Sequence, residues 1–205
     1  MNLTLKESLV TRSRVFSPWT AFYFLQSLLI NLGLGYPFSL LYTAAFTAIL
    51  LLLWRTLPRV QKVLVGISSL VAACYFPFAQ AYGAPNFNTL LALHSTNMEE
   101  STEILTIFPW YSYLVGLFIF VLGVIAIRRK KESEKARWNT FDSLCLVFSV
   151  ATFFVAPVQN LAWGGVFKLK DTGYPVFRFA KDVIVNNNEV IEEQERMAKL
   201  SGMKD

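Results

Sequence analysis

The chain has 205 residues, of which 54% are hydrophobic and 16% are charged. A soluble domain usually carries about 25% charged residues, so this composition argues against a soluble globular enzyme and indicates a membrane protein. The net charge is +5, and the basic residues lie mainly at the ends of apolar segments without interleaved aromatic residues. We therefore expect no nucleic-acid partner.

Five apolar segments approach the length of about 20 residues that a membrane-spanning helix needs. They are residues 18–34, 38–54, 63–82, 110–127 and 141–158. The first two are short, and the turn signal GLGYP separates them. We interpret them as a helical hairpin, with a re-entrant pair as the alternative.

The basic residues predict the orientation of these segments. Twelve Lys and Arg residues precede the first segment or lie in the second and fourth connections: Lys6, Arg12, Arg14, Arg55, Arg59, Lys62, Arg128, Arg129, Lys130, Lys131, Lys135 and Arg137. The GLGYP turn and the connection at residues 83–108 hold neither Lys nor Arg. The positive-inside rule therefore predicts a cytoplasmic N-terminus and a C-terminus on the opposite side.

The apolar segments carry few polar groups. No Lys, Arg or Glu lies in the middle of a segment, and Asp142 lies at a predicted cytoplasmic edge. Transporters and proton pumps usually need ionisable groups within the membrane, so this pattern argues against those classes. Gly116 and Gly123 share one face of the fourth segment and predict close approach of another helix.

Both cysteines lie inside apolar segments. We expect Cys74 and Cys145 to be buried and to act as small hydrophobic residues. They lack the close spacing of a metal or redox pair. His94 is the only histidine, too few for a zinc site of about four ligands, so we expect neither a metal site nor a catalytic residue in this chain.

The stretch HSTNMEESTEIL, residues 94–105, gathers three glutamates in an otherwise apolar region. Thr96 and Glu99 have the spacing of a capping box, and Asn97 and Glu100 repeat it. A short helix over residues 97–105 would place these acids near its positive end. Helix capping alone is therefore one explanation of the cluster.

The tail differs from the apolar region before it. Residues 176–184 predict an amphipathic helix lying on the outer membrane–water boundary. The run of three asparagines at 186–188 predicts a break, with Asn188 as the N-cap of a second, charged helix. We interpret this second helix as a connector to a further domain, with a frayed tail as the alternative. The predicted domains are thus 1–165, a five-span membrane domain, and 166–205, the interfacial and connector helices.

Residues 96–105, TNMEESTEIL, resemble the Thr-Asn-x-x-Glu-Ala-x-Glu-x-Leu signature of the membrane domain of bacterial phosphoethanolamine transferases. Those enzymes belong to the alkaline-phosphatase-like (sulfatase) superfamily. They have five N-terminal spans, the signature in the periplasmic loop after the third span, and a bridging segment before a soluble domain. Ser101 stands where the family often has Ala, and Ala92 where relatives that prefer lipid A tend to carry Asn.

The resemblance implies an all-α integral membrane bundle of five transmembrane helices, with a periplasmic loop helix and a C-terminal amphipathic bridging helix. It places the protein in the bacterial inner membrane as a multi-pass protein with a periplasmic C-terminus. It further implies transfer of phosphoethanolamine from phosphatidylethanolamine to a cell-envelope glycolipid or glycan. The residues it assigns to donor binding are Glu100, Thr96, Asn97 and Glu103.

In that family the zinc ligands and the threonine nucleophile belong to the soluble domain. We therefore expect this chain to anchor the enzyme and to help bind the lipid donor, and to be inactive alone. Its expected partners are phosphatidylethanolamine, other membrane lipids and its own catalytic domain, which holds the zinc. The alternative is a non-enzymatic membrane scaffold or lipid-binding subunit, and a small transporter is a third.

Overall fold

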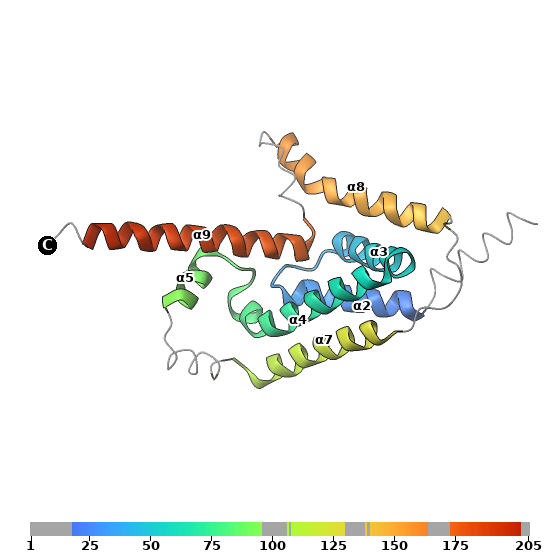
Figure 1. The fold of residues 1–205 in the computed structure, drawn as a ribbon, viewed down its shortest axis with the longest axis horizontal. Helices are drawn as coiled ribbons and strands as arrows, with labels where there is room; N and C mark the ends of the chain where they lie inside the picture. Colours follow the sequence, from blue (N-terminus) through green and yellow to red (C-terminus); the bar gives the residue numbers. More distant parts are fainter. Residues whose placement is uncertain are drawn as a thin grey trace, which may run out of the picture.

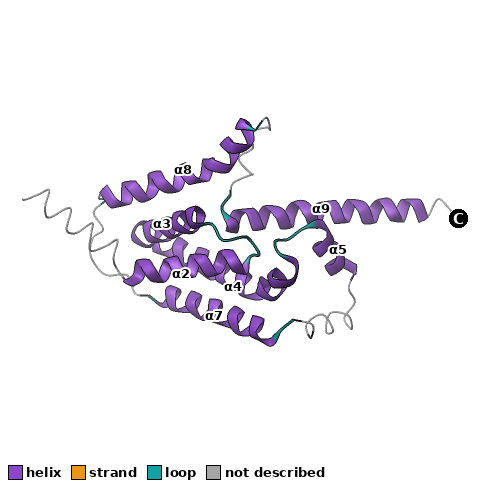
Figure 2. Ribbon diagram, turned by 180° about the vertical axis from the view of Figure 1, so that it is seen from behind, coloured by secondary structure: helices purple, strands orange, loops and turns teal. Residues whose placement is uncertain are grey.

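The computed structural model describes residues 18–95, 106, 108–129, 138, 140–163 and 173–201. Over these ranges the chain is all-helical and has no strand (Figures 1 and 2). The helices are α2 (Pro18–Gly33), α3 (Leu40–Thr56), α4 (Pro58–Tyr82), α5 (Phe87–Ser95), α7 (Trp110–Arg128), α8 (Thr140–Ala162) and α9 (Pro175–Ser201). The predicted all-α class is confirmed.

Among the described helices, α4, α7 and α8 are long and apolar enough to cross a membrane. Helices α2 and α3 have 16 and 17 residues, which at about 1.5 Å per residue is shorter than the hydrocarbon core of about 30 Å. The ends of all five helices lie within a few residues of the predicted apolar segments. Helix α4 begins earlier than expected, at Pro58, because proline is well tolerated in a first helical turn.

Helix α2 is joined to α3 and α4 by buried side-chain hydrogen bonds. Gln26 donates to Ser69 Oγ of α4 at 3.1 Å, and Asn31 donates to Thr43 Oγ1 of α3 at 3.0 Å. Bonds of this kind between helices in a membrane contribute about 0.6–2 kcal/mol each. They give the polar residues of the first apolar segment a structural role.

Helices α4 and α7 pack closely along the two glycines that the sequence placed on one face. A Cβ added at Gly116 would lie 2.6 Å from the backbone oxygen of Ala73, and one at Gly123 would lie 2.6 Å from Ser69 Cβ. Real Cβ atoms do not approach other atoms so closely. The predicted role of these glycines in helix packing is therefore confirmed.

Helix α8 lies beside α3, on the side of the bundle away from α7 (Figure 1). Arg55 Nη1 of α3 donates to both carboxylate oxygens of Asp142 at 2.5 Å. The two side chains are only 16% and 4% exposed, so the pair is largely buried. Removing one partner of a buried ion pair typically costs about 3–5 kcal/mol, which makes this contact a strong link between α3 and α8.

The two cysteines differ in burial. Cys145 is buried as predicted, but Cys74 is exposed on α4, so the prediction for Cys74 was wrong. An apolar helix facing lipid needs no protein neighbour to cover such a residue, because lipid tails solvate it.

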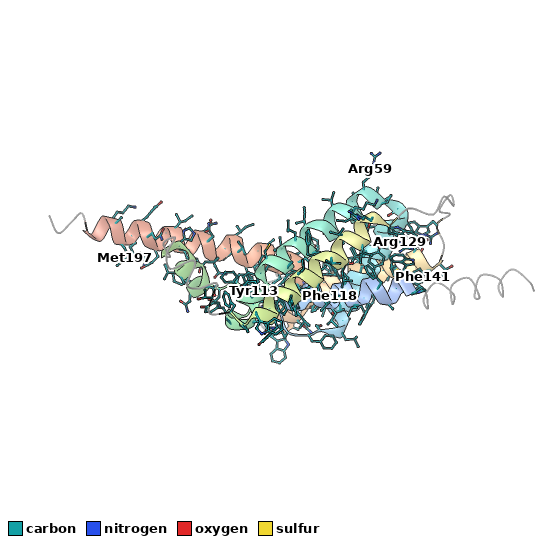
Figure 3. The ribbon with its side chains drawn as sticks, turned by 90° about the horizontal axis from the view of Figure 1, so that it is seen from below. Arg59, Tyr113, Phe118, Arg129, Phe141 and Met197 are labelled. Carbon is teal, nitrogen blue, oxygen red and sulfur yellow. The ribbon has the colours of Figure 1, made fainter. Side chains whose placement is uncertain are left out.

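Basic residues lie at the end of α3, the start of α4 and the end of α7. Figure 3 shows Arg59 and Arg129 at the same end of the bundle as Phe141, with Met197 at the far end of α9 on the other side. The Arg129 guanidinium carbon lies 4.1 Å from the centre of the Trp19 ring and 3.5 Å from that of Trp54. These cation–π contacts fix Arg129 where α2, α3 and α7 meet.

Helix α9 corrects the prediction for the tail. It is one continuous helix of 27 residues, not two helices broken at the three asparagines. Asn186 Nδ2 donates to the backbone oxygen of Asp182 at 2.6 Å, one turn earlier. Asn186 thus satisfies its side-chain amide without breaking the helix, and contacts with other parts of the chain outweigh the weak helix propensity of the asparagines.

The apolar face of α9 was expected to lie on the membrane boundary, but part of it packs against protein. Val176 and Phe179 contact the core. The Phe179 ring centre lies 5.0 Å from that of Tyr75 in α4. These two side chains therefore have partners within the chain and do not need the membrane surface.

A helix that the sequence analysis did not predict is present in the connection between α4 and α7. Helix α5 begins at Phe87, and Asn86 Oδ1 accepts a hydrogen bond from the backbone N–H of Thr89 at 3.0 Å. This is the geometry of an asparagine N-cap. The helix predicted over residues 97–105 lies outside the described residues.

The contact between α4 and α7 generates a stability prediction. We expect Gly116→Ala to lower the free energy of unfolding by about 1–3 kcal/mol, because the added Cβ forces backbone apart. Gly66→Ala is the control, since its Cβ would meet only the flexible end of Ile127 at 3.1 Å. Thermal unfolding followed by circular dichroism in detergent compares the two. Equal stability of both variants would contradict the close packing at Gly116.

Candidate functional site

The residues that the sequence assigns to donor binding, Thr96, Asn97, Glu100 and Glu103, lie outside the described residues. The structure neither brings them together nor separates them. It does describe α5, which ends at Ser95, the residue immediately before Thr96. The position of α5 is thus the nearest structural information on the acidic cluster.

Helix α5 is docked on the middle of α9. His94 Nε2 donates to Asn187 Oδ1 at 2.8 Å, and Asn186 Nδ2 donates to the backbone oxygen of Pro85 at 3.5 Å. Views from opposite sides both show α5 against α9 (Figures 1 and 2). The histidine that the sequence left without a role therefore joins the loop helix to the tail helix.

A second set of contacts joins the start of α9 to the turn between α2 and α3. The Tyr36 hydroxyl donates to Asp182 Oδ2 at 2.8 Å, and Arg178 Nε lies 3.6 Å from the same oxygen. The Arg178 guanidinium carbon also lies 4.9 Å from the centre of the Tyr36 ring. We call Tyr36, Arg178 and Asp182 the α9 anchor.

The chemistry of the α9 anchor keeps Tyr36 in its neutral form. Burial, and then the hydrogen bond to the Asp182 carboxylate and its charge, raise the pKa of Tyr36 well above its usual value of 10. A neutral phenol is the donor that a carboxylate accepts from. The Tyr36 hydroxyl therefore keeps the proton that it donates to Asp182.

Beside the α9 anchor lies a cavity of about 580 Å³. Its wall comes from the α2–α3 turn, the last turns of α8 and the first turns of α9, and we call it the junction cavity. The lining residues are Tyr36, Pro37, Ser39, Tyr42, Ala156, Gln159, Asn160, Gly173, Pro175, Arg178, Lys181 and Asp182. The described part of this lining includes Lys181 and the ion pair of Arg178 with Asp182.

The sequence holds two signals for this region. Arg178, Lys181 and Asp182 fall on the polar half of the amphipathic pattern at residues 176–184. Gln159 and Asn160 follow the fifth apolar segment. The sequence does not show that the polar residues of 176–184 lie near Gln159 and Asn160, because the residues between them belong to neither the apolar segment nor the amphipathic pattern.

Comparison with known proteins bears on the whole chain. No family model and no solved structure matches it. Over all 205 residues the chain is 98% identical to phosphoethanolamine transferase OpgE of Escherichia coli (strain K12), and it spans 39% of that protein's length. The matching part is the N-terminal region of OpgE. This confirms the predicted resemblance to the N-terminal membrane domain of the phosphoethanolamine transferases.

The contact between α5 and α9 can be tested with neighbouring asparagines. We expect Asn187→Ala to speed amide hydrogen exchange in α5 by roughly fivefold, because losing a hydrogen bond costs about 0.5–1.5 kcal/mol. Asn188→Ala is the matched control, since Asn188 is exposed. Hydrogen exchange read by mass spectrometry supplies the measurement. Equal protection of α5 in both variants would show that His94 and Asn187 do not hold α5 in place.

Proposed function

We propose that this chain is the membrane part of a phosphoethanolamine transferase. It anchors the enzyme in the bacterial inner membrane and helps the enzyme to bind phosphatidylethanolamine, the lipid donor. The observation that carries the proposal is the 98% identity over the whole chain to the N-terminal region of OpgE. The apolar helices α4, α7 and α8, each long enough to span a membrane, agree with an anchoring role.

The proposed topology has five spans, α2, α3, α4, α7 and α8, with the N-terminus in the cytoplasm and the C-terminus in the periplasm. Its support is the basic residues at the ends of α3 and α7 and the start of α4, of which Figure 3 shows Arg59 and Arg129 at one end of the bundle. The short helices α2 and α3 are compatible with spanning, because a bilayer thins locally around a short helix at a modest cost. In this topology α5, α9 and the junction cavity all face the periplasm.

Donor binding is proposed for the acidic cluster that follows α5. The ethanolamine head group carries an ammonium, which the Glu100 carboxylate can pair with at the membrane surface. Partial desolvation there makes such a pair stronger than in bulk water. Thr96 and Asn97 would supply neighbouring polar contacts, and Glu103 a further acid.

The chemical step is proposed to take place elsewhere in the whole protein. By the resemblance, a soluble periplasmic domain would supply zinc ligands and a threonine that accepts the phosphoethanolamine group before passing it to a cell-envelope glycolipid or glycan. The continuous helix α9 is suited to lead from the bundle towards such a domain. The helical bundle and the soluble domain would then both contact the donor lipid.

The proposed topology predicts the outcome of fusions at residue 205. Alkaline phosphatase joined there should be active and green fluorescent protein dark, since only the phosphatase matures in the periplasm. Fusions in the connection between α7 and α8, after Lys135, should give the opposite pattern. Fluorescence and phosphatase activity in whole cells are the measurements. A reversed pattern at residue 205 would place the acidic cluster in the cytoplasm and end the proposal for donor binding.

The proposed donor site predicts a specific loss of transfer. Glu100→Gln in the full-length protein should lower transfer from labelled phosphatidylethanolamine by about tenfold or more, because a hydrogen bond to a charged group contributes about 1.5–3 kcal/mol. Glu99→Gln is the matched control and should retain most activity, since the sequence predicts a capping-box role for Glu99. Activity is normalised to folded protein in the membrane. If both variants transfer as well as the wild type, the cluster only caps a helix and the chain fits a scaffold better.

A further inference from the structure

The outer part of α9, beyond its contact with α5, carries large apolar side chains on its surface. Ile191 is 40% exposed and Met197 is 60% exposed. Gln194, which is also exposed, lies three residues from each of them, and residues three apart are neighbours on the surface of a helix. We call Ile191, Gln194 and Met197 the outer patch. We propose that the outer patch is the docking surface for the protein's own soluble domain.

The outer patch continues the side of α9 on which α5 is docked. Asn187 of α9 is bound by His94 of α5, and Val190, three residues further along, is 0% exposed. Met197 follows Val190 by seven residues, which is about two helical turns, so it projects from nearly the same side of α9. A domain docked on the outer patch would therefore lie next to the helix that ends immediately before Thr96.

The lipid head groups do not reach this part of α9. Figures 1 and 3 view the molecule from perpendicular directions, and both show α9 projecting beyond the ends of α4 and α7, which cross the membrane in the proposed topology. Ile191 and Met197 follow the anchor residue Asp182 by nine and fifteen residues, or about 14 and 22 Å along the helix. The head-group layer is only about 5–8 Å thick on each side of the bilayer. A protein surface is therefore the occupant that fits.

The comparison with OpgE indicates which protein surface this is. The chain spans 39% of OpgE and matches its N-terminal region, so more than half of OpgE follows the part that corresponds to this chain. Helix α9 ends at Ser201, four residues after Met197. A domain attached just beyond α9 is held at a high effective concentration beside the outer patch, which a free partner would not be.

The composition around the outer patch predicts the chemistry of the surface that binds it. The stretch at residues 189–195 holds four glutamates and neither Lys nor Arg. A complementary surface has an apolar depression for Ile191 and Met197 and a rim of basic residues. The flexible thioether side chain of Met197 can adapt to such a depression.

This inference rests on the proposed function, because it needs the soluble domain, but it does not depend on Glu100. Docking on the outer patch would hold the catalytic domain on the side of α9 where α5 leads into the proposed donor stretch. The docking surface and the donor site can therefore be tested separately.

The test is photo-crosslinking in the full-length protein, with a protease cleavage site inserted after residue 205. With p-benzoylphenylalanine at position 191, irradiation in membranes should join the two parts, so that they stay together on a denaturing gel after cleavage. Position 189 is the matched control, because Glu189 is also exposed and lies nearly opposite Ile191 on the helix. We expect a yield about fivefold or more higher at 191 than at 189. Met197→Asp should lower the yield at 191 by about fivefold, because it places a charge in an apolar contact.

Three outcomes would overturn the inference. Equal yields at positions 191 and 189 would mean that no domain docks on this side of α9. A product of twice the mass would show that a second copy covers the outer patch, and crosslinks to lipid would show that the membrane does. If the crosslink forms and Glu100→Gln transfers as well as the wild type, the donor site is wrong and the docking surface stands. If the crosslink is absent and Glu100→Gln loses transfer, the docking surface is wrong and the donor site stands.

Discussion

The hydrogen bond from Tyr36 to Asp182 determines where α9 begins relative to the bundle. Tyr36 is 5% exposed, so its hydroxyl depends on a partner within the protein. Leaving that hydroxyl without a partner would cost about 1–3 kcal/mol. Arg178 reinforces the contact, because it lies close to the Asp182 oxygen and over the Tyr36 ring. A bond between residues 146 apart in sequence thereby fixes the junction of bundle and tail.

Because α9 is one continuous helix, the α9 anchor, together with the packing of Val176 and Phe179 on the core, also sets the position of residues further along it. Asn187 lies just over one turn after Asp182 and reaches His94 of α5. Had the three asparagines broken the helix, the anchor would not have fixed the α5 contact. The continuity of α9 therefore couples the loop helix to the bundle through the tail.

The apolar segments, and with them the five bundle helices, could be predicted from the sequence because their signal is local. Length and hydropathy decide where an apolar helix begins and ends, and even the packing of Gly116 against α4 follows from small residues on one face. The junction could not be predicted in this way. Asn188 carried a valid N-cap signal, and Asp182 belonged to a valid polar face, but both signals describe an isolated helix. The contacts with Tyr36 and α5 outweigh these local signals, and they join residues about 90 to 150 positions apart. The periodicity of a sequence does not predict such pairs.

The two ends of the bundle hold their charged groups in different ways. At the end that carries Arg129, the charges have partners inside the chain: Arg55 pairs with the largely buried Asp142, and Arg129 lies over the rings of Trp19 and Trp54. Burying a charged group is costly unless it is partnered, so these contacts serve the stability of the bundle. At the other end, polar residues of α8 and α9 line the junction cavity, and Arg178, Gln159 and Asn160 among them are exposed. The same end carries α5, which ends at the residue before Thr96. Accessible polar side chains thus lie at the end where the proposed donor site follows α5, which is the distribution expected of a membrane domain that takes part in substrate handling as well as in attachment.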